Sequence, residues 1–154
     1  MPQDQLFDSC LSRAMALCSG REYCSGDLIS KLHSWGLNQD ETNNAMEILI
    51  KEKFIDDERF AAAFVRDKFQ IGKWGKAKIS FSLRSKDIPG DVISRALSLI
   101  DDEIYRETLK ELLSGHRKHI RSKNQYDLKG KLYRFGIAKG YESSLVYEII
   151  NEIC

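Results

Sequence analysis

Residues 54–66 of the chain read FIDDERFAAAFVR. The three acidic residues at 56–58 favour a helix start, because carboxylates cap the first backbone N–H groups and interact favourably with the helix dipole. Phe60, Phe64 and Phe69 then recur at helical spacing, and Gly72 suits a helix end. The segment therefore predicts an amphipathic helix that begins close to residue 57.

A similar helical pattern recurs on both sides of this segment. Three leucines are each followed five residues later by an aliphatic residue, in the pairs Leu32 with Leu37, Leu83 with Ile88, and Leu132 with Ile137. The leucines are 51 and 49 residues apart, which leaves room for three helices per repeat. Units of this size bury little alone and stabilise one another by stacking. We predict an all-α, elongated array of three tandem three-helix repeats, over 1–55, 56–100 and 101–154; the alternative is one irregular bundle.

One segment also suits another secondary structure. Residues 79–83 read ISFSL, and this alternation of apolar and polar side chains is typical of a strand. The segment is isolated among helical patterns and has no partner strand. We therefore predict that it is helical.

The composition is that of a soluble globular chain, with 154 residues of which 42% are hydrophobic and 31% charged. No apolar run is long enough to span a bilayer, and residues 1–4 lack the features of a secretory signal. We expect a cytoplasmic protein without membrane contact. Nothing in the sequence suggests an obligate dimer, so we expect a monomer.

The cysteines and histidines do not form a metal-binding pattern. They are Cys10, Cys18, Cys24, Cys154, His33, His116 and His119, and they include no CxxC pair. A zinc site needs closely grouped nitrogen and sulfur donors. We therefore expect no metal, no cofactor and reduced thiols, with Cys10 and Cys18 on the buried side of the first helix.

No arrangement of residues indicates catalysis. The acidic clusters at 56–58 and 101–103 both stand where a helix is predicted to begin, so capping explains them. His116 and His119 lie one turn apart without a nucleophile pattern, and His116 fits an apolar stripe that should be packed. We do not expect an enzyme.

Charge is unevenly distributed along a chain whose net charge is only +1. Residues 1–65 carry 6 basic and 11 acidic side chains, whereas residues 66–99 carry 8 basic and 3 acidic ones. Eight basic residues fall within 117–139, opposed only by Asp127. This pattern can present a positive strip to a polyanion while the acidic first repeat contacts protein or points outward.

Each repeat contains a helix, a short turn and a second helix, which resembles a DNA-reading motif whose second helix enters the major groove. The second helices here are acidic: the one after Gly136 carries three glutamates and no Lys or Arg. Phosphate would repel such a helix, so we do not expect base-reading helices. The expected binding residues lie on the other helices and the connectors: Arg66, Lys68, Lys73, Trp74, Lys76, Lys78, Arg84, Lys86, Arg117, Lys118, Arg121, Lys123, Lys129, Lys131 and Arg134.

Trp74 lies in the segment Gly72-Lys73-Trp74-Gly75-Lys76, which does not fit a phosphate-binding loop. The ring could stack on a base or fill a partner's pocket. Alternatively, it could pack against its own repeat within a flexible connector. The sequence leaves both interpretations open.

Four groups of residues resemble one known family: Arg21-Glu22-Tyr23 with Asp27-Leu28 and Lys31-Leu32; residues 54–66; Gly72, Gly75, Ile79, Leu83, Lys86 and Ile88; and Lys129, Leu132, Phe135 and Gly136. Together they resemble the RecX family of bacterial recombination regulators, and the second group is the most specific. Three positions depart from the family pattern. Cys24 stands where a capping Ser is frequent, so Ser25 is expected to take over the cap. Asp87 replaces a frequent Gly, and Trp74 is unusually bulky.

The resemblance implies a curved, modular, all-helical protein that lies in the groove of a RecA–single-stranded-DNA filament. Such a protein blocks strand exchange and ATP hydrolysis by RecA, or promotes filament disassembly, and so modulates homologous recombination and DNA repair. RecA contact is then the main interaction and single-stranded DNA is a secondary partner, with double-stranded DNA left open. The alternative is a general DNA-binding module that competes for DNA.

Overall fold

The computed structural model describes residues 3–154, and every regular element within that range is a helix. The helices are α1 (Gln3–Gly20), α2 (Ser25–Ser34), α3 (Gln39–Lys51), α4 (Asp57–Gln70), α5 (Lys76–Ser85), α6 (Gly90–Leu97), α7 (Asp102–Arg117), α8 (Gln125–Ala138) and α9 (Ser143–Ile153). The predicted all-α class is confirmed. The ambiguous segment 79–83 lies inside α5 and is helical, as predicted.

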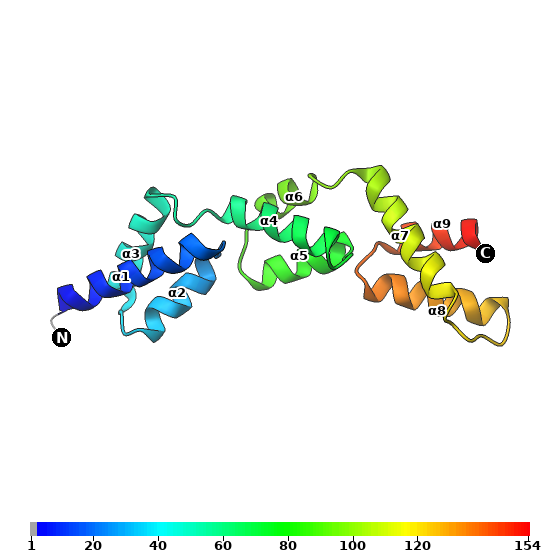
Figure 1. Ribbon diagram of the computed structural model, residues 1–154, viewed down its shortest axis with the longest axis horizontal. Coiled ribbons are helices and arrows are strands. Elements are labelled where there is room, and N and C mark those ends of the chain that lie inside the picture. The colour runs from blue at the N-terminus through cyan, green and yellow to red at the C-terminus, as the bar shows by residue number, and fades with distance from the viewer. Residues whose placement is uncertain (1–2) are drawn as a thin grey trace.

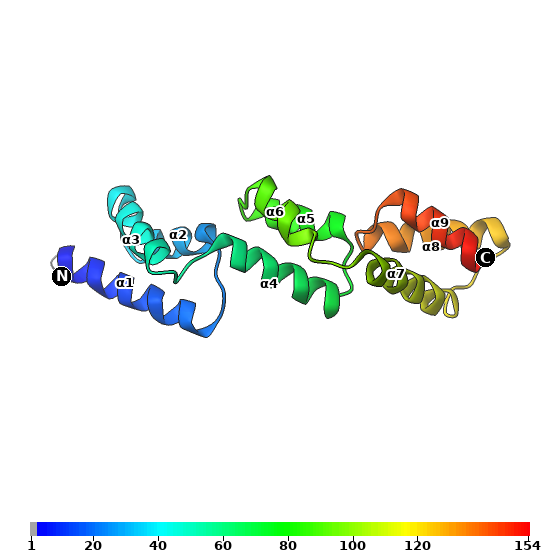
Figure 2. The same ribbon diagram turned by 90° about the horizontal axis from the view of Figure 1, so that it is seen from above.

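The helices form three groups that follow one another along the long axis, with the two termini at opposite ends (Figure 1, Figure 2). Helices α1, α2 and α3 pack together, as do α4, α5 and α6, and then α7, α8 and α9. This grouping supports the divisions at 55/56 and 100/101, which we propose as the domain boundaries.

Acidic and amide side chains begin several of the helices, as the sequence predicted. The Asp56 carboxylate accepts hydrogen bonds from the backbone N–H groups of Glu58 and Arg59, at 3.0 and 3.1 Å. Asp101 accepts one from Ile104, at 3.0 Å. The acidic clusters that could have suggested catalysis therefore cap α4 and α7.

The expected cap of α2 is wrong, because the Ser25 side chain makes no capping hydrogen bond. The backbone N–H of Ser25 instead donates to the Asp57 carboxylate, at 2.9 Å, so the second repeat supplies the acceptor. Asp87 adopts φ 61°, the left-handed conformation that a glycine would adopt easily and that Asp tolerates better than most residues.

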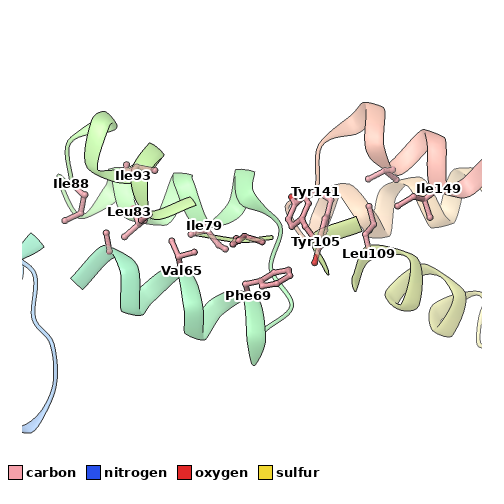
Figure 3. Close-up of a cluster of buried hydrophobic side chains, with 14 of the residues drawn as sticks. Val65, Phe69, Ile79, Leu83, Ile88, Ile93, Tyr105, Leu109, Tyr141 and Ile149 are labelled. Atoms are coloured by element: carbon pink, nitrogen blue, oxygen red, sulfur yellow. The ribbon is translucent and has the colours of Figure 1, made fainter. Parts of the chain in front are cut away.

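The repeated leucines Leu32, Leu83 and Leu132 are each fully buried, so the pattern identified equivalent core positions. Among residues 3–154, the buried hydrophobic side chains nevertheless form two clusters and not three. One cluster belongs to the first repeat, from Cys10 to Ile55. The other runs through the second and third repeats (Figure 3). It also includes Cys24 from the first repeat.

The second and third repeats join through close backbone contact, which we call the second junction. The N–H of Gly75 donates to the Lys139 carbonyl at 2.7 Å, and the N–H of Ala77 donates to the Gly140 carbonyl at 2.9 Å. A Cβ atom on Gly75 would lie 2.3 Å from the Gly140 backbone, and one on Gly140 would lie 2.3 Å from the Lys78 Cβ. Only glycine at these two positions allows the repeats to approach so closely.

Aromatic rings fill the rest of the second junction. The Tyr105 ring lies 4.9 Å from that of Tyr141 and 5.8 Å from that of Phe69, between centroids (Figure 3). The Tyr105 hydroxyl donates to the Glu142 carboxylate at 2.7 Å and accepts from the Lys76 N–H at 2.9 Å. Buried rings with satisfied hydroxyl groups make this junction stiff.

The junction between the first and second repeats, which we call the first junction, is mainly polar. Arg59 pairs with Glu22 at 2.5 Å, and Lys86 pairs with Asp27 at 3.6 Å. All four side chains remain between 30% and 42% exposed, so water and salt screen these pairs. The first junction is therefore the weaker connection.

The two buried tyrosines of the second junction predict sensitivity to alkaline pH. Desolvation raises the pKa of both Tyr105 and Tyr141, because burial disfavours the charged phenolate. A raised folded-state pKa contributes stability below the unfolded value of about 10, and this contribution is lost as pH rises above it. We expect urea unfolding midpoints to fall above about pH 10.

Tyrosinate absorbance and circular dichroism followed together check this expectation. In the unmodified protein, ionisation of Tyr105 and Tyr141 should coincide with loss of helicity. The variant Tyr105→Phe/Tyr141→Phe should lose that late absorbance step. Ionisation of either residue in a fully helical chain near pH 10 would contradict the burial argument.

Candidate functional site

The predicted cations do not form one uniform surface. One set gathers at the second junction, another lies on the third repeat, a third is engaged in ion pairs within the chain, and Arg84 lies apart on the outer face of α5. The surroundings of each cation decide what it can bind.

Trp74 lies at the centre of the first set, held against its own repeat. The Phe64 ring meets its ring edge-on at a centroid distance of 6.5 Å. The Lys68 and Lys78 ammonium groups lie 4.8 and 4.4 Å from the Trp74 ring centroid. Cation–π attraction at these distances holds both charges beside the half-buried indole. The structure therefore favours packing of Trp74 within the repeat, and base stacking by this ring stays a prediction.

Two more lysines join this set from either side of the second junction. Lys73 is exposed, and its backbone has φ 57° while its carbonyl accepts a hydrogen bond from the Tyr141 hydroxyl at 2.9 Å. Lys139 donates from Nζ to the Gly72 carbonyl at 3.1 Å. We define the junction cluster as Lys68, Lys73, Trp74, Lys78 and Lys139. Among the salt bridges within residues 3–154, none involves these four lysines.

Lys139 was not among the residues predicted for the site. It belongs to the basic run 117–139 but lies 67 residues from Gly72, and only the fold brings the two together. The sequence feature that could have identified Lys139 was the basic run 117–139, but this run gave no indication of the second junction. The sequence therefore located the charge but not its neighbours.

Three predicted cations are already partnered elsewhere. Lys76 lies 3.7 Å from Asp102 and 4.7 Å from the centroid of the Tyr105 ring, in the packing of the second junction. Lys86 pairs with Asp27 across the first junction. Arg66 lies 3.5 Å from Asp67. Their binding role stays a prediction, and the structure does not place them in the junction cluster.

The outer face of α5 carries a feature that sequence reasoning missed. Phe81 is 73% exposed and lies three residues from both Lys78 and Arg84, so helical spacing places it on the same face as both. Arg84 is exposed and donates to the Ser80 hydroxyl at 2.9 Å. At 100° per residue, Phe81 lies on the opposite side of α5 from the buried residues Ile79 and Leu83. This position could have indicated from the sequence that Phe81 is exposed.

The third repeat orders its cations around one carboxylate. Asp127 accepts from the Lys123 N–H at 3.1 Å and pairs with Lys131 at 3.2 Å. Together these contacts lower the pKa of Asp127, with the backbone hydrogen bond as the larger cause. Lys131 also donates to the Arg121 carbonyl at 2.6 Å, and so holds the connector between α7 and α8. The single acidic residue of the basic run is thus fully engaged.

The other predicted cations of this repeat are distributed over its helix ends and α8. Arg117 donates to the Ile153 carbonyl at 2.5 Å at the end of α7, and Lys118 caps that helix. Lys129 and Arg134 lie on α8, where they border a groove between α8 and α9. These positions are accessible to a polyanion.

The acidic side chains of α9 turn away from that region. Glu148 lies 3.1 Å from Arg106 on α7, and Glu152 pairs with both Arg106 and Lys110. Because these carboxylates are matched by cations of the same repeat, α9 is less repulsive to a polyanion than its sequence indicated.

The four cysteines and His116 are buried or half-buried, whereas His33 and His119 are exposed. Within residues 3–154 all four cysteines are free thiols, and no three residues of His, Cys, Asp or Glu are grouped to hold a metal ion. Cys10 is buried as expected, and Cys18 is half-buried. His116 stacks on Phe135 at a centroid distance of 3.8 Å, as its place in the apolar stripe predicted. Across the same residues, no helix is both long and apolar enough for a membrane span.

The fold and this distribution of charge define a class: an elongated array of tandem three-helix domains with cations on its middle and last members. Residues 56–97 match the family model described as RecX, second three-helix domain. The crystal structure of RecX from Lactobacillus salivarius has a TM-score of 0.86 and 21% identity, over 97% of both chains. A second crystal structure, of regulatory protein RecX, has a TM-score of 0.86 and 25% identity, over 96% of this chain and 73% of the other.

Curated relatives agree. The regulatory protein RecX of Clostridium botulinum (strain Eklund 17B) is 33% identical over 124 residues, which are 79% of this chain and 58% of the relative. That of Clostridium beijerinckii is 24% identical over 155 residues, 99% of this chain and 72% of the relative. The chain belongs to the RecX family of regulatory proteins. It spans 58% of the length of the first of these relatives.

Proposed function

We propose that the chain is a non-enzymatic regulator that binds the groove of a RecA–single-stranded-DNA filament and inhibits RecA. The observation that carries this proposal is the junction cluster, whose four lysines have no carboxylate partner among the described residues. Four unneutralised cations on a stiff joint suit a surface that carries phosphate and acidic side chains. We propose RecA as the partner because the chain belongs to the RecX family. We also propose that the protein is a cytoplasmic monomer.

The shape of the molecule supports a groove as the binding place. The helices form an elongated array with the acidic first repeat at one end, followed by the two repeats that carry the candidate cations (Figure 1). Such an array can lie along a filament while the acidic repeat contacts protein or faces outward. A net charge of +1 limits attraction to free DNA, because non-specific DNA binding depends on phosphate neutralisation.

The second candidate is a general DNA-binding module that competes for DNA. The exposed Phe81 between Lys78 and Arg84 favours it, because an aromatic ring beside cations suits single-stranded nucleic acid. Titration of naked DNA and of RecA filament at one salt concentration separates the two proposals. A general module binds both with similar affinity and a steep salt dependence.

Charge reversal in the junction cluster tests the first proposal. In Lys73→Glu/Lys78→Glu, each charge reversal replaces an attraction with a repulsion. Each reversal should weaken the binding free energy by roughly 1.4 kcal/mol, which is tenfold in affinity. We expect about a hundredfold more protein to be needed for half-inhibition of RecA-driven ATP hydrolysis. Lys76 is left unchanged because it contributes to the second junction.

The matched control is Lys51→Glu/Lys53→Glu, which changes the net charge equally on exposed lysines of the acidic repeat. This control should inhibit RecA as the unmodified protein does. Circular dichroism establishes that both variants are folded. Full inhibition by a folded Lys73→Glu/Lys78→Glu variant would remove the junction cluster from the binding surface.

A further inference from the structure

A groove of about 470 Å³ lies between α8 and α9 on the third repeat. Its lining includes three tyrosines, Tyr126, Tyr133 and Tyr147, together with Lys129, Gly130 and Arg134. The two helices lie side by side at the C-terminal end of the array (Figure 1, Figure 2). The proposed function uses the cations here but gives no role to the rings.

Two of these tyrosines are strongly exposed, and the third is held in place. Tyr126 is 89% exposed and Tyr147 is 62% exposed, so the hydrophobic core gains little from either ring. The Tyr133 ring meets that of Tyr147 edge-on at a centroid distance of 5.4 Å. Its hydroxyl is 2.8 Å from that of Ser143. The groove thus presents aromatic faces from both helices in a defined arrangement.

Gly130 lies between Tyr126 and Tyr133 on the same face of α8, because residues four and seven positions apart share a helix face. A Cβ atom at this position would meet only the Arg134 guanidinium, at an ordinary 3.5 Å. Packing within the chain therefore does not require glycine, although glycine inside a helix is less stable than alanine. Because Gly130 has no side chain, the groove stays open between the Tyr126 and Tyr133 rings.

The electrostatic surroundings of the groove are positive. Lys129 and Arg134 border it, and neither forms a salt bridge with another residue of 3–154. Asp127, at the rim, is engaged by Lys131 and by the Lys123 N–H. The α9 carboxylates pair with α7 on the other side of that helix.

We propose that this groove binds single-stranded DNA by stacking two or three bases on its tyrosines, with phosphates at Lys129 and Arg134. Tyr126 and Tyr133 are seven residues apart, or roughly 10 Å along a helix, which spans that many nucleotides. Stacking needs bases that are free of a duplex, and aromatic faces beside cations suit them without reading their sequence. The inference deepens the proposed function and rests on it, since a RecA filament contains single-stranded DNA.

Two oligonucleotides separate stacking from charge. Oligothymidylate and an abasic strand of the same length carry the same phosphates, but only the first carries bases. We expect Tyr126→Ala/Tyr147→Ala to weaken oligothymidylate binding by tenfold or more in a fluorescence anisotropy titration, because the variant loses two of the rings on which bases stack. Binding of the abasic strand should not change.

Two control variants accompany the test. Tyr126→Phe/Tyr147→Phe keeps the rings and should bind oligothymidylate as the unmodified protein does. Ile71→Ala removes an equally exposed apolar side chain, 82% exposed, far from the groove in sequence, and should have no effect. Circular dichroism establishes the fold of each variant.

The outcomes are distinct. Unchanged oligothymidylate binding by the folded Ala variant, or an equal loss for the abasic strand, would overturn the stacking groove. Loss of RecA binding without DNA, with oligothymidylate binding intact, would make the groove a protein-docking surface and overturn it too. If the base-dependent loss is seen while the unmodified protein fails to inhibit RecA, the groove stands and the proposed function alone fails.

Discussion

Gly140→Ala is expected to destabilise the chain by about 2–5 kcal/mol and to separate the second repeat from the third. Gly140 has φ +97°, which side-chain-bearing residues rarely adopt. Its new Cβ would lie 2.3 Å from the Lys78 Cβ and 2.8 Å from the Lys78 nitrogen. Relief of this overlap requires the two backbones to move apart, and the hydrogen bonds of Gly75 and Ala77 to the third repeat would then be lost.

Urea unfolding followed by circular dichroism measures this effect. Gly115→Ala is the matched control, because Gly115 lies inside α7 with open space around its would-be Cβ. That control should stabilise the chain by about 1 kcal/mol through helix propensity. A Gly140→Ala variant as stable as the unmodified protein would show that the second junction does not depend on close backbone contact.

Alanine at the repeated core leucines is expected to cost about 2–5 kcal/mol at each position, through lost burial and an incompletely collapsed cavity. The consequences should differ along the chain. Leu32 belongs to the cluster of the first repeat, so Leu32→Ala should unfold that repeat at lower urea while the remainder stays folded. Leu83 belongs to the cluster shared by the second and third repeats, so Leu83→Ala should shift both together.

The two tryptophans report on the two clusters separately. Trp35 packs against the first cluster and Trp74 against the shared one. Each tryptophan is followed alone, Trp35 in Leu32→Ala/Trp74→Phe and Trp74 in Leu32→Ala/Trp35→Phe. The fluorescence of Trp35 should change at a lower urea concentration than that of Trp74. The same two backgrounds without a core substitution serve as controls. Coincident transitions in Leu32→Ala would contradict the division into two clusters.

Local patterns in the sequence predicted the helical class and much of the local structure. The spacing of Leu32, Leu83 and Leu132 identified buried positions, and the acidic clusters identified helix caps. The expected Ser25 cap was wrong because its replacement, Asp57, comes from the next repeat. Local spacing carries no information about which repeat supplies an acceptor 32 residues away.

The candidate site was predicted by its charge but not by its geometry. A basic run does not indicate which side chains turn toward a carboxylate of another unit, as Lys76 and Lys86 do. Nor does it indicate that Lys139 reaches the connector of the second repeat. The α8–α9 groove depends on two helices that share no motif, so Tyr126 and Tyr147 were not recognised as a pair.

The unequal joints of this molecule have a mechanical consequence. The aromatic joint fixes the angle between the second and third repeats, so these two repeats keep one relative orientation and act as a single rigid body. The polar joint rests on half-exposed ion pairs, the Ser25–Asp57 hydrogen bond and the buried Cys24, so it resists a change of angle less than the aromatic joint does. On a long helical filament, such a molecule adapts by changing the orientation of its first repeat. Binding then costs conformational entropy at one junction only.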